Sequence, residues 1–468
     1  MAPESALGRY DMTTNPARTK NVSHFIALFM VLFGALSTST AVSQERERPT
    51  LKDFGSSLKQ LKWDPERNAA IETKPRPATT RRSEEGDVVR IETSLVVCDV
   101  LVLDTRGQTV QGLTEKDFVL SEDGKQQKIG MFSPGDNTAV PRSIVLIIDY
   151  SSSQFPFINT SIEAAKKLVD KITPIDRMAI VTDDVELLQD FTNDNKILKD
   201  KLESLRQRST NWDSSHLSPR QRFGRSNQYS ALLATLREAF DEEDERPIII
   251  FQTDGDEAVH LRNPITVRQV PPSLPKDLRK DAERALSNWQ KDPRNKQREF
   301  SLNDVYRAVE KSRAIIYTVI PGFRLIGLGV DKQMKNLEAE RLRALLAEPP
   351  AMSNNFRAAM LKREQDRWAR TPPEARTYEL GEELKVQAAL AVVATITGGW
   401  TEFLEEPSQA DEIYSRIFSD INRRYVVGYY PTNKEHDGKR RKLSIEVRSH
   451  PEYLVLGRKS YLAPDPDQ

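Results

Sequence analysis

The feature that most constrains this chain is residues 143–154, which read S-I-V-L-I-I-D-Y-S-S-S-Q. Branched apolar residues fill positions 144–148 and run directly into Asp149 and a group of serines. An unbroken apolar run without alternation is typical of a strand that is covered on both faces, as in the centre of a parallel sheet. Binding sites in such sheets gather beyond the carboxyl ends of the strands. The stretch therefore predicts a buried central strand that delivers oxygen ligands to that edge.

Alternating strand and helix patterns continue from residue 141 to residue 424. This alternation argues for an α/β fold with a doubly wound, mostly parallel sheet and crossover helices. Strands are predicted over residues 177–182, 185–191, 247–253, 314–320 and 400–404, and helices over 161–172, 195–205, 229–240, 386–397 and 410–423.

Two long segments, 255–303 and 322–384, interrupt this alternation. Each follows a predicted strand, so both insertions leave the sheet at its carboxyl edge. The second contains stretches of helical propensity with an amphipathic pattern. The insertions either pad the domain as solvated helices or cap the site at that edge and restrict its partner.

Shorter strand patterns lie on both sides of the α/β domain. Residues 88–137 and 425–463 carry them, with turn signals such as E-D-G-K at 122–125 and D-G at 437–438. We expect a small antiparallel β unit from these strands.

The amino terminus reads as an export signal over residues 1–43. Arg18 and Lys20 precede an apolar run over residues 25–36, and small residues follow. That run is shorter than the roughly 20 residues that span a bilayer, and an uncleaved signal anchor stays an alternative. Membrane contact is expected only in that case. Residues 44–87, charged and dotted with proline, predict a flexible linker, so the protein is expected to be exported and periplasmic, cell-surface or secreted.

Charge and cysteine content exclude several other classes. Lys+Arg and Asp+Glu number 69 each, so the formal net charge is zero and no nucleic-acid partner is expected. Cys98 is the only cysteine, which rules out an internal disulfide. It lies in an apolar run, where a buried small hydrophobe is a better interpretation than a reactive thiol.

Oxygen-bearing side chains converge beyond the first central strand. Asp149, Ser151 and Ser153 occupy alternate positions, so a gently turned backbone can aim all three at one point. Asp254 ends a second apolar strand in T-D-G, and the doubly wound topology brings it beside Asp149. Two such acids repel each other unless a cation lies between them. An ordinary turn explains D-x-S-x-S alone, but the second acidic strand end favours a Mg²⁺ site, with Mn²⁺ or Ca²⁺ as related ions.

A further acidic pair follows another strand at the same edge. Asp183 and Asp184 come directly after the predicted strand 177–182. They could support a second cation, but a solvated turn is the expected structure.

These residues resemble the metal-ion-dependent adhesion site of the von Willebrand factor type A domain. That site combines D-x-S-x-S, a downstream Thr and a later Asp in T-D-G, and residues 149–153 and 253–255 match its first and last elements. Family members often read G-G-T before Y-x-A-L, whereas this chain has G-R-S at 224–226 before Y-S-A-L at 229–232. Serine keeps the oxygen ligand, and Ser230 is a less suitable substitute. The resemblance implies a metal site formed by Asp149, Ser151, Ser153, Ser226 and Asp254.

The resemblance extends to a bacterial, exported family related to this domain. Its members carry segments similar to residues 110–132 before the domain, and to residues 425–433 and 437–447 after it. By analogy with other inserted domains of this type, the two flanks are expected to pair into one β-sandwich-like unit.

The preferred interpretation is a non-enzymatic, exported binding or adhesion protein. An open coordination position on the metal would accept an acidic side chain from a protein partner. A metal-independent structural or assembly module of the cell envelope is the first alternative, and the altered G-R-S element supports it. A metal-assisted hydrolase is the second, although no His, Cys or Lys accompanies the motif as a base or nucleophile.

Overall fold

The computed structural model describes most of the chain after residue 94. The described residues are 61–64, 69–72, 95–135, 141–154, 156–210, 227–240, 246–291, 296–346 and 354–464. The predicted export signal and Ser226 lie outside these ranges. Within the predicted linker, β1 (Leu61–Asp64) and β2 (Ala69–Glu72) form an antiparallel pair. No helix in the described part of the chain is long and apolar enough to cross a membrane.

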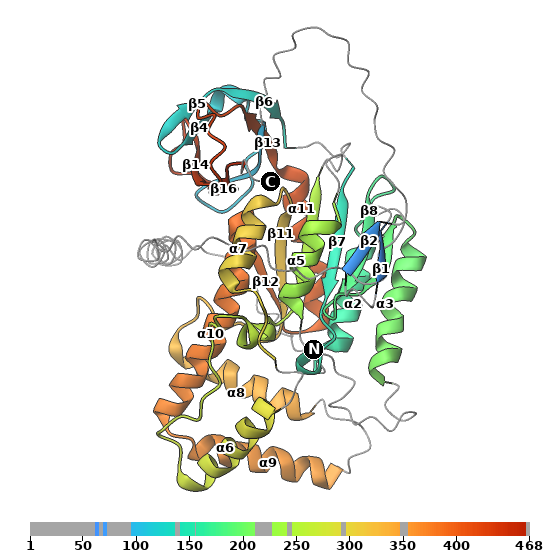
Figure 1. Ribbon diagram of the computed structural model, residues 1–468, viewed down its shortest axis with the longest axis vertical. Coiled ribbons are helices and arrows are strands. Elements are labelled where there is room, and N and C mark those ends of the chain that lie inside the picture. The colour runs from blue at the N-terminus through green and yellow to red at the C-terminus, as the bar shows by residue number, and fades with distance from the viewer. Residues whose placement is uncertain are drawn as a thin grey trace, which may run out of the picture.

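A twisted, mostly parallel sheet forms the centre of the described structure (Figure 1). Its spatial order is β12-β11-β10-β7-β8-β9, so β7, the first of these six strands along the chain, lies in the middle and the order reverses there. Only the edge strand β9 runs antiparallel to its neighbour. The predicted doubly wound α/β class is therefore confirmed. The strands are β7 (Ser143–Ile148), β8 (Arg177–Thr182), β9 (Leu187–Thr192), β10 (Pro247–Gln252), β11 (Ile315–Pro321) and β12 (Thr401–Leu404).

Helices cover both faces of this sheet, which is why β7 is apolar at every position. Val145 and Ile147 pack against one helical layer, whereas Ile144, Leu146 and Ile148 pack against the other. Each fully buried side chain of this size contributes about 1.5–3 kcal/mol. The first layer holds α5 (Gln228–Glu238), α7 (Leu302–Lys311) and α10 (Pro373–Thr397), and the second holds α2 (Ile158–Val169), α3 (Asn195–Thr210) and α11 (Ala410–Arg423).

The two flanks of the α/β domain pair into one β-sandwich, as predicted. Its sheets have the orders β15-β3-β13-β6 and β16-β14-β4-β5, so strands from both ends of the chain alternate. The consecutive strands β5 and β6 bend from one sheet into the other, and β15 and β16 do the same, which leaves few open edges. The strands are β3 (Val96–Leu103), β4 (Phe118–Glu122), β5 (Lys125–Gln127), β6 (Ile129–Ser133), β13 (Tyr425–Tyr429), β14 (Arg440–Val447), β15 (Leu454–Leu456) and β16 (Ser460–Leu462).

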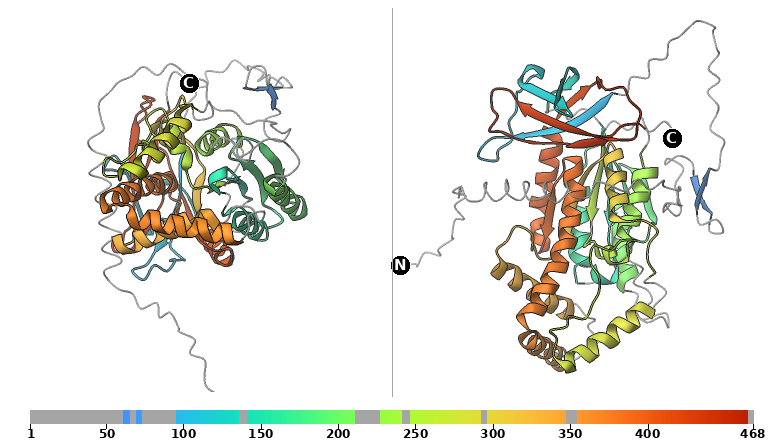
Figure 2. Two further views of the ribbon diagram at one scale, coloured as in Figure 1. Left: turned by 90° about the horizontal axis from the view of Figure 1, so that it is seen from below. Right: turned by 60° about the vertical axis from the view of Figure 1, so that its left-hand side comes forward.

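The insertions gather at the end of the sheet opposite the sandwich (Figures 1 and 2). They contribute α6 (Lys276–Lys291), α8 (Val330–Leu346) and α9 (Asn354–Arg370). Leu325, Leu337, Trp368 and Leu380 give the second insertion a small core of its own. Helix α10 begins at Pro373, so the helix predicted from residue 386 continues into the second insertion.

The two insertions also contact each other. Arg370 forms an ion pair with Asp277, and the Tyr378 hydroxyl donates to the Val267 carbonyl at 3.0 Å. The helical end of the molecule is therefore built jointly by both segments.

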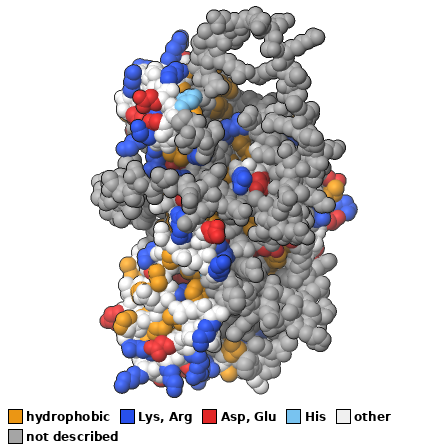
Figure 3. All heavy atoms as spheres, in the orientation of Figure 1, with side chains coloured by type: hydrophobic (Ala, Val, Ile, Leu, Met, Phe, Trp, Pro, Cys, Tyr) orange, Lys and Arg blue, Asp and Glu red, His pale blue; other side chains and the backbone are white. Residues whose placement is uncertain are grey.

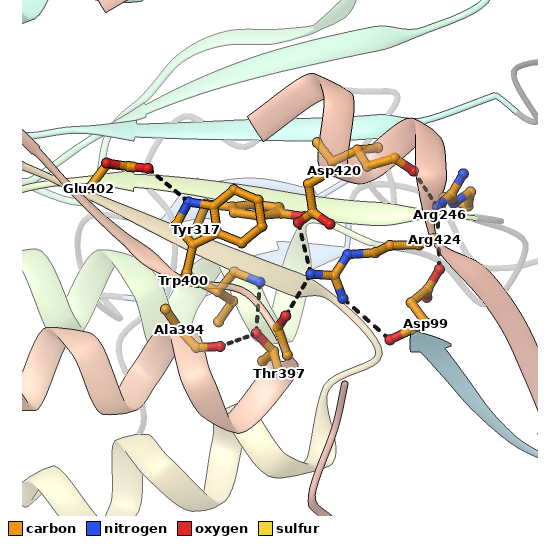
Figure 4. A network of polar contacts seen from close by, with 12 residues as sticks. Asp99, Arg246, Tyr317, Ala394, Thr397, Trp400, Glu402, Asp420 and Arg424 are labelled. Carbon is orange, nitrogen blue, oxygen red and sulfur yellow. Dashed lines mark hydrogen bonds and ion pairs between the residues drawn. The ribbon is translucent and has the colours of Figure 1, made fainter. Parts of the chain in front are cut away.

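A buried polar network joins the sandwich to the amino ends of the sheet (Figure 4). The Arg424 side chain is fully buried, forms a 2.8 Å ion pair with Asp420 and donates to the carbonyls of Gly398 and Asp99 at 2.6 and 3.3 Å. The Tyr317 hydroxyl donates to the same Asp420 carboxylate at 2.6 Å. These bonds link strand β3 of the sandwich to α11 and β11 of the α/β domain.

Candidate metal-binding site

Register places the two acidic strand ends side by side. Ile148 at the end of β7 lies opposite Gln252 at the end of β10, and the Asp149 N–H donates to the Gln252 carbonyl at 3.0 Å. Asp149 is 1% exposed, whereas Asp254 is half-buried. The carboxyl ends of the two central strands thus bring both carboxylates to one point.

The loop after β7 turns the serine hydroxyls toward each other. The Ser151 N–H donates to Asp149 Oδ1 at 2.9 Å, a local bond of the kind that Asp makes in tight turns. The hydroxyl oxygens of Ser151 and Ser153 then lie 3.0 Å apart. Two hydroxyls and a carboxylate from one short loop are therefore presented together.

Side-chain amides and a threonine hydroxyl bind the two carboxylates. Asp149 Oδ2 accepts from Thr253 Oγ1 and from Gln228 Nε2, both at 2.9 Å. The same Gln228 nitrogen lies 3.3 Å from Asp254 Oδ1, and Gln154 Nε2 donates to Asp254 Oδ2 at 2.7 Å. Gln154 Oε1 is buried without a hydrogen-bond partner.

The environment disfavours charge on both acids. Burial, with the Asp254 carboxylate adding to it, raises the pKa of Asp149 to about 7. Desolvation and the neighbouring Asp256 carboxylate raise the pKa of Asp254 to about 6. A cation between the carboxylates would reverse these shifts, because opposite charge favours the ionised form.

The backbone conformation and the close packing at position 255 explain the glycine of the T-D-G element. Gly255 has φ of 78°, and a Cβ there would lie 3.0 Å from Leu390 Cδ1 and 3.1 Å from Val386 Cγ1. The left-handed turn lets α10 pack directly against the strand end.

The third predicted element is only partly described. Ser226 lies outside the described residues. Ser230, the weaker substitute, donates from its hydroxyl to Glu257 Oε1 at 2.7 Å. Its hydroxyl is therefore engaged away from the two aspartates.

The expectation of a solvated turn at Asp183 is wrong. Asp183 is 1% exposed, and its Oδ1 accepts from the Tyr150 N–H at 3.1 Å. Asp184 accepts from the Tyr150 hydroxyl at 3.1 Å. Both acids hold the loop that carries the serines, because the loop after β8 packs against the loop after β7.

Sequence reasoning missed three residues that contact the aspartates. Thr253 was visible as part of T-D-G but was not assigned a contact. Gln154 and Gln228 gave no signal, since amides have no characteristic spacing and reach the carboxylates only after the fold is formed.

The donor set fits a hard divalent cation. Among the described residues no group of three or more His, Cys, Asp or Glu side chains is placed to hold a metal. The site instead offers two carboxylates, two hydroxyls and the unpartnered Gln154 Oε1. All are oxygen ligands, which suit Mg²⁺, Mn²⁺ or Ca²⁺ and not zinc.

Strand order and loop chemistry together define the fold of this domain. The first strand of the sheet is central, the third is an antiparallel edge and the first loop reads D-x-S-x-S, and this arrangement is the fold of a von Willebrand factor type A domain.

Several solved structures resemble the chain loosely. A serine-substituted aerotolerance-related membrane protein from Bacteroides fragilis is 14% identical, with 60% of this chain and 98% of that chain covered and a TM-score of 0.32. The von Willebrand factor domain of the type V pili tip protein Mfa5 from Porphyromonas gingivalis is 15% identical, with 60% and 95% covered and a TM-score of 0.32. Manganese-loaded TRAP protein from Plasmodium vivax is 12% identical, with 73% and 98% covered and a TM-score of 0.25.

Other comparisons add nothing to this. No protein-family model matches the sequence, and no curated protein is significantly similar to it. Because the structural superpositions are loose, the fold assignment rests on the strand order and the loop residues.

Proposed function

We propose that this chain is an exported, non-enzymatic binding protein that engages an acidic group of a protein partner through a divalent cation. The observation that carries the proposal is the meeting of Asp149 and Asp254 with the hydroxyls of Ser151 and Ser153 at the end of the sheet. Ser226 is proposed as the remaining ligand. Mg²⁺ is the preferred ion, with Mn²⁺ or Ca²⁺ as related candidates.

The residues of the chain divide the work of such a site. Ser151 and Ser153 present neutral oxygens, and the two aspartates supply charge directly or through water. The cation would neutralise the carboxylate pair and offer a coordination position to a carboxylate from outside. Asp183 and Asp184 hold the serine loop in place through Tyr150.

The helical end of the molecule carries more exposed basic than acidic side chains on α6 and α9. Figure 3 shows Lys and Arg side chains there, interspersed with Asp and Glu. The exposed basic side chains of the two helices are Lys276, Lys280, Arg284, Lys291, Lys362, Arg363, Arg367 and Arg370, and the exposed acidic ones are Asp277, Asp281, Glu283 and Asp366. An excess of positive charge raises the encounter rate with an acidic segment, and this effect falls as salt increases.

Export is proposed from the sequence of the first 43 residues. The charged start, the apolar run and the small residues that follow suit a periplasmic, cell-surface or secreted protein.

Metal titration tests the binding proposal. Mg²⁺ and Mn²⁺ are added to the full-length chain and followed by calorimetry and thermal shift, with chelator as the reference. The wild type is expected to bind and to melt at a higher temperature, whereas Asp149→Ala is not. Asp200→Ala, on the exposed face of α3, is the matched control and should respond like the wild type. A wild type that ignores both ions, or an Asp149→Ala variant that responds equally, contradicts the proposal.

A metal-independent structural module is the second candidate. Gln228 donates to both carboxylates and Gln154 donates to that of Asp254, so hydrogen bonds in the described structure stabilise the two acids without an ion. Loss of stability in Asp149→Ala without any metal response in the wild type would favour this alternative.

The hydrolase alternative has less support. The described side-chain partners of Asp149 and Asp254 are hydroxyls and amides, which do not act as general bases. Hydrolysis of generic ester or phosphate substrates that depended on Asp149 would favour an enzyme instead.

A further inference from the structure

Gln228 is the first residue of α5, and its side chain is completely buried between the two aspartates and the first insertion. Its Oε1 accepts from the Glu257 N–H at 2.9 Å. Since a backbone N–H can only donate, this bond fixes which end of the amide is oxygen. The NH₂ group must therefore face the carboxylates, where it lies 2.9 Å from Asp149 Oδ2 and 3.3 Å from Asp254 Oδ1.

Two carboxylates that share one amide group repel each other unless something positive lies between them. A fixed amide NH₂ is the positive end of a dipole, and hydrogen bonds to charged acceptors are roughly twice as strong as neutral ones. We propose that Gln228 is a positioning residue that ties the Asp149–Asp254 carboxylate pair together from inside the protein, so that the site stays assembled without a cation.

The first insertion holds this amide in place. Glu257 is fully buried and accepts from the N–H groups of Tyr229 and Ser230 at 2.6 and 3.1 Å, so its carboxylate caps the start of α5. Arg298, at the end of the insertion, donates to Glu257 Oε1 at 2.7 Å. The chain of contacts therefore runs from Arg298 through Glu257 to Gln228 and the two aspartates.

The hydrogen bonds from Gln228 also determine which oxygen of Asp149 is left for an ion. Asp149 Oδ2 accepts from both Gln228 and Thr253, which uses its two lone pairs. Oδ1 accepts the Ser151 N–H and retains a lone pair on the side of the serine loop. Gln228 thus directs any cation toward Ser151 and Ser153, but its own role does not depend on a cation.

A double-mutant cycle in chelator tests the interaction between Gln228 and Asp149 in the full-length chain. Gln228→Leu keeps the size of the side chain and removes its donors, and its melting temperature should fall by about 5 °C. In the Asp149→Asn background the same change should cost less than half of that, because the charged partner is gone. Gln387→Leu is the matched control, since this buried amide binds Leu325, Ile326 and Phe323 and no aspartate. The fall in melting temperature caused by Gln387→Leu should add to the fall caused by Asp149→Asn.

A second variant keeps the test decisive if Gln228→Leu does not fold. Gln228→Glu places a third carboxylate at the pair and should lower the melting temperature in chelator, and Asp149→Asn should then restore it. The proposal is overturned if the falls in melting temperature caused by Gln228→Leu and Asp149→Asn are additive. It is also overturned if Gln228→Leu has no effect in chelator.

Metal titration of the same variants separates this inference from the proposed function. A cation should raise the melting temperature of Gln228→Leu more than that of the wild type. If the wild type ignores Mg²⁺ and Mn²⁺, the binding proposal fails, while the cycle in chelator still decides whether Gln228 ties the pair.

Discussion

The buried ion pair between Asp420 and Arg424 gives a sharp test of how the sandwich and the α/β domain are joined. The two side chains are 1% and 0% exposed, and their closest atoms lie 2.8 Å apart. Replacing Asp420 with Ala leaves the guanidinium buried without its hydrogen-bonded carboxylate and removes the acceptor of the Tyr317 hydroxyl. Removing one partner of a buried pair costs about 3–5 kcal/mol.

A double variant that removes both charges distinguishes the loss of the ion pair from the loss of packing. Asp420→Leu with Arg424→Met replaces the pair by apolar side chains of similar size, and such replacements are often neutral or stabilising. We therefore expect the double variant to be more stable than Asp420→Ala, even though it carries more substitutions. At about 2–4 °C per kcal/mol for a domain of this size, the single variant should melt roughly 10 °C below the wild type.

Denaturant unfolding of the wild type, both variants and Asp200→Ala measures these differences. Asp200 forms a pair with Lys196 at 2.6 Å, but their side chains are 65% and 85% exposed, so its removal should leave stability within error of the wild type. A loss below about 1 kcal/mol in Asp420→Ala, or a double variant less stable than the single one, refutes the reasoning.

Two further predictions concern the backbone and the thiol. Gly398→Ala should destabilise the protein by more than about 1 kcal/mol, because its φ is 85° and a Cβ there would lie 2.7 Å from Gly457 Cα. Gly398 caps the end of α10, and Gly381 lies inside this helix with open space around the position. Gly381→Ala should therefore be neutral or stabilising when both variants are compared by thermal melting. Cys98 is 1% exposed and burial raises the pKa of its thiol to about 12, so a thiol reagent should react with it only after unfolding. Rapid reaction of the folded protein would contradict this.

The fold was largely predictable because its signals are local. The apolar run of β7 indicated a central strand, and every residue of that strand is buried. The pairing of the two flanks needed the family resemblance, since no local pattern states which strands meet.

The candidate site was less predictable, for a physical reason. Asp149 and Asp254 follow apolar strands, so topology alone brings them together. Gln228 and Gln154 reach the carboxylates from other elements, and Asp183 becomes buried only because the loop after β7 packs over it. Tertiary contacts between polar side chains leave no periodic trace in a sequence.

The arrangement of the sandwich also has a consequence for how the protein is made. Asp99 in β3 and Arg424 before β13 are in contact although 325 residues separate them in the sequence. At synthesis rates of about 5–20 residues per second, β3 leaves the ribosome tens of seconds before its partner strand exists. Closing an unstructured loop of this length would cost roughly 5 kcal/mol.

A folded α/β domain removes most of that cost, because its sheet starts and ends on the side where the sandwich forms. The α/β domain should therefore fold first, and the sandwich should close last, after the final strands of the chain emerge. Until then β3 lacks both of its partner strands and β4 is paired only with β5, so both have exposed edges, the state in which a nascent chain is most prone to aggregate.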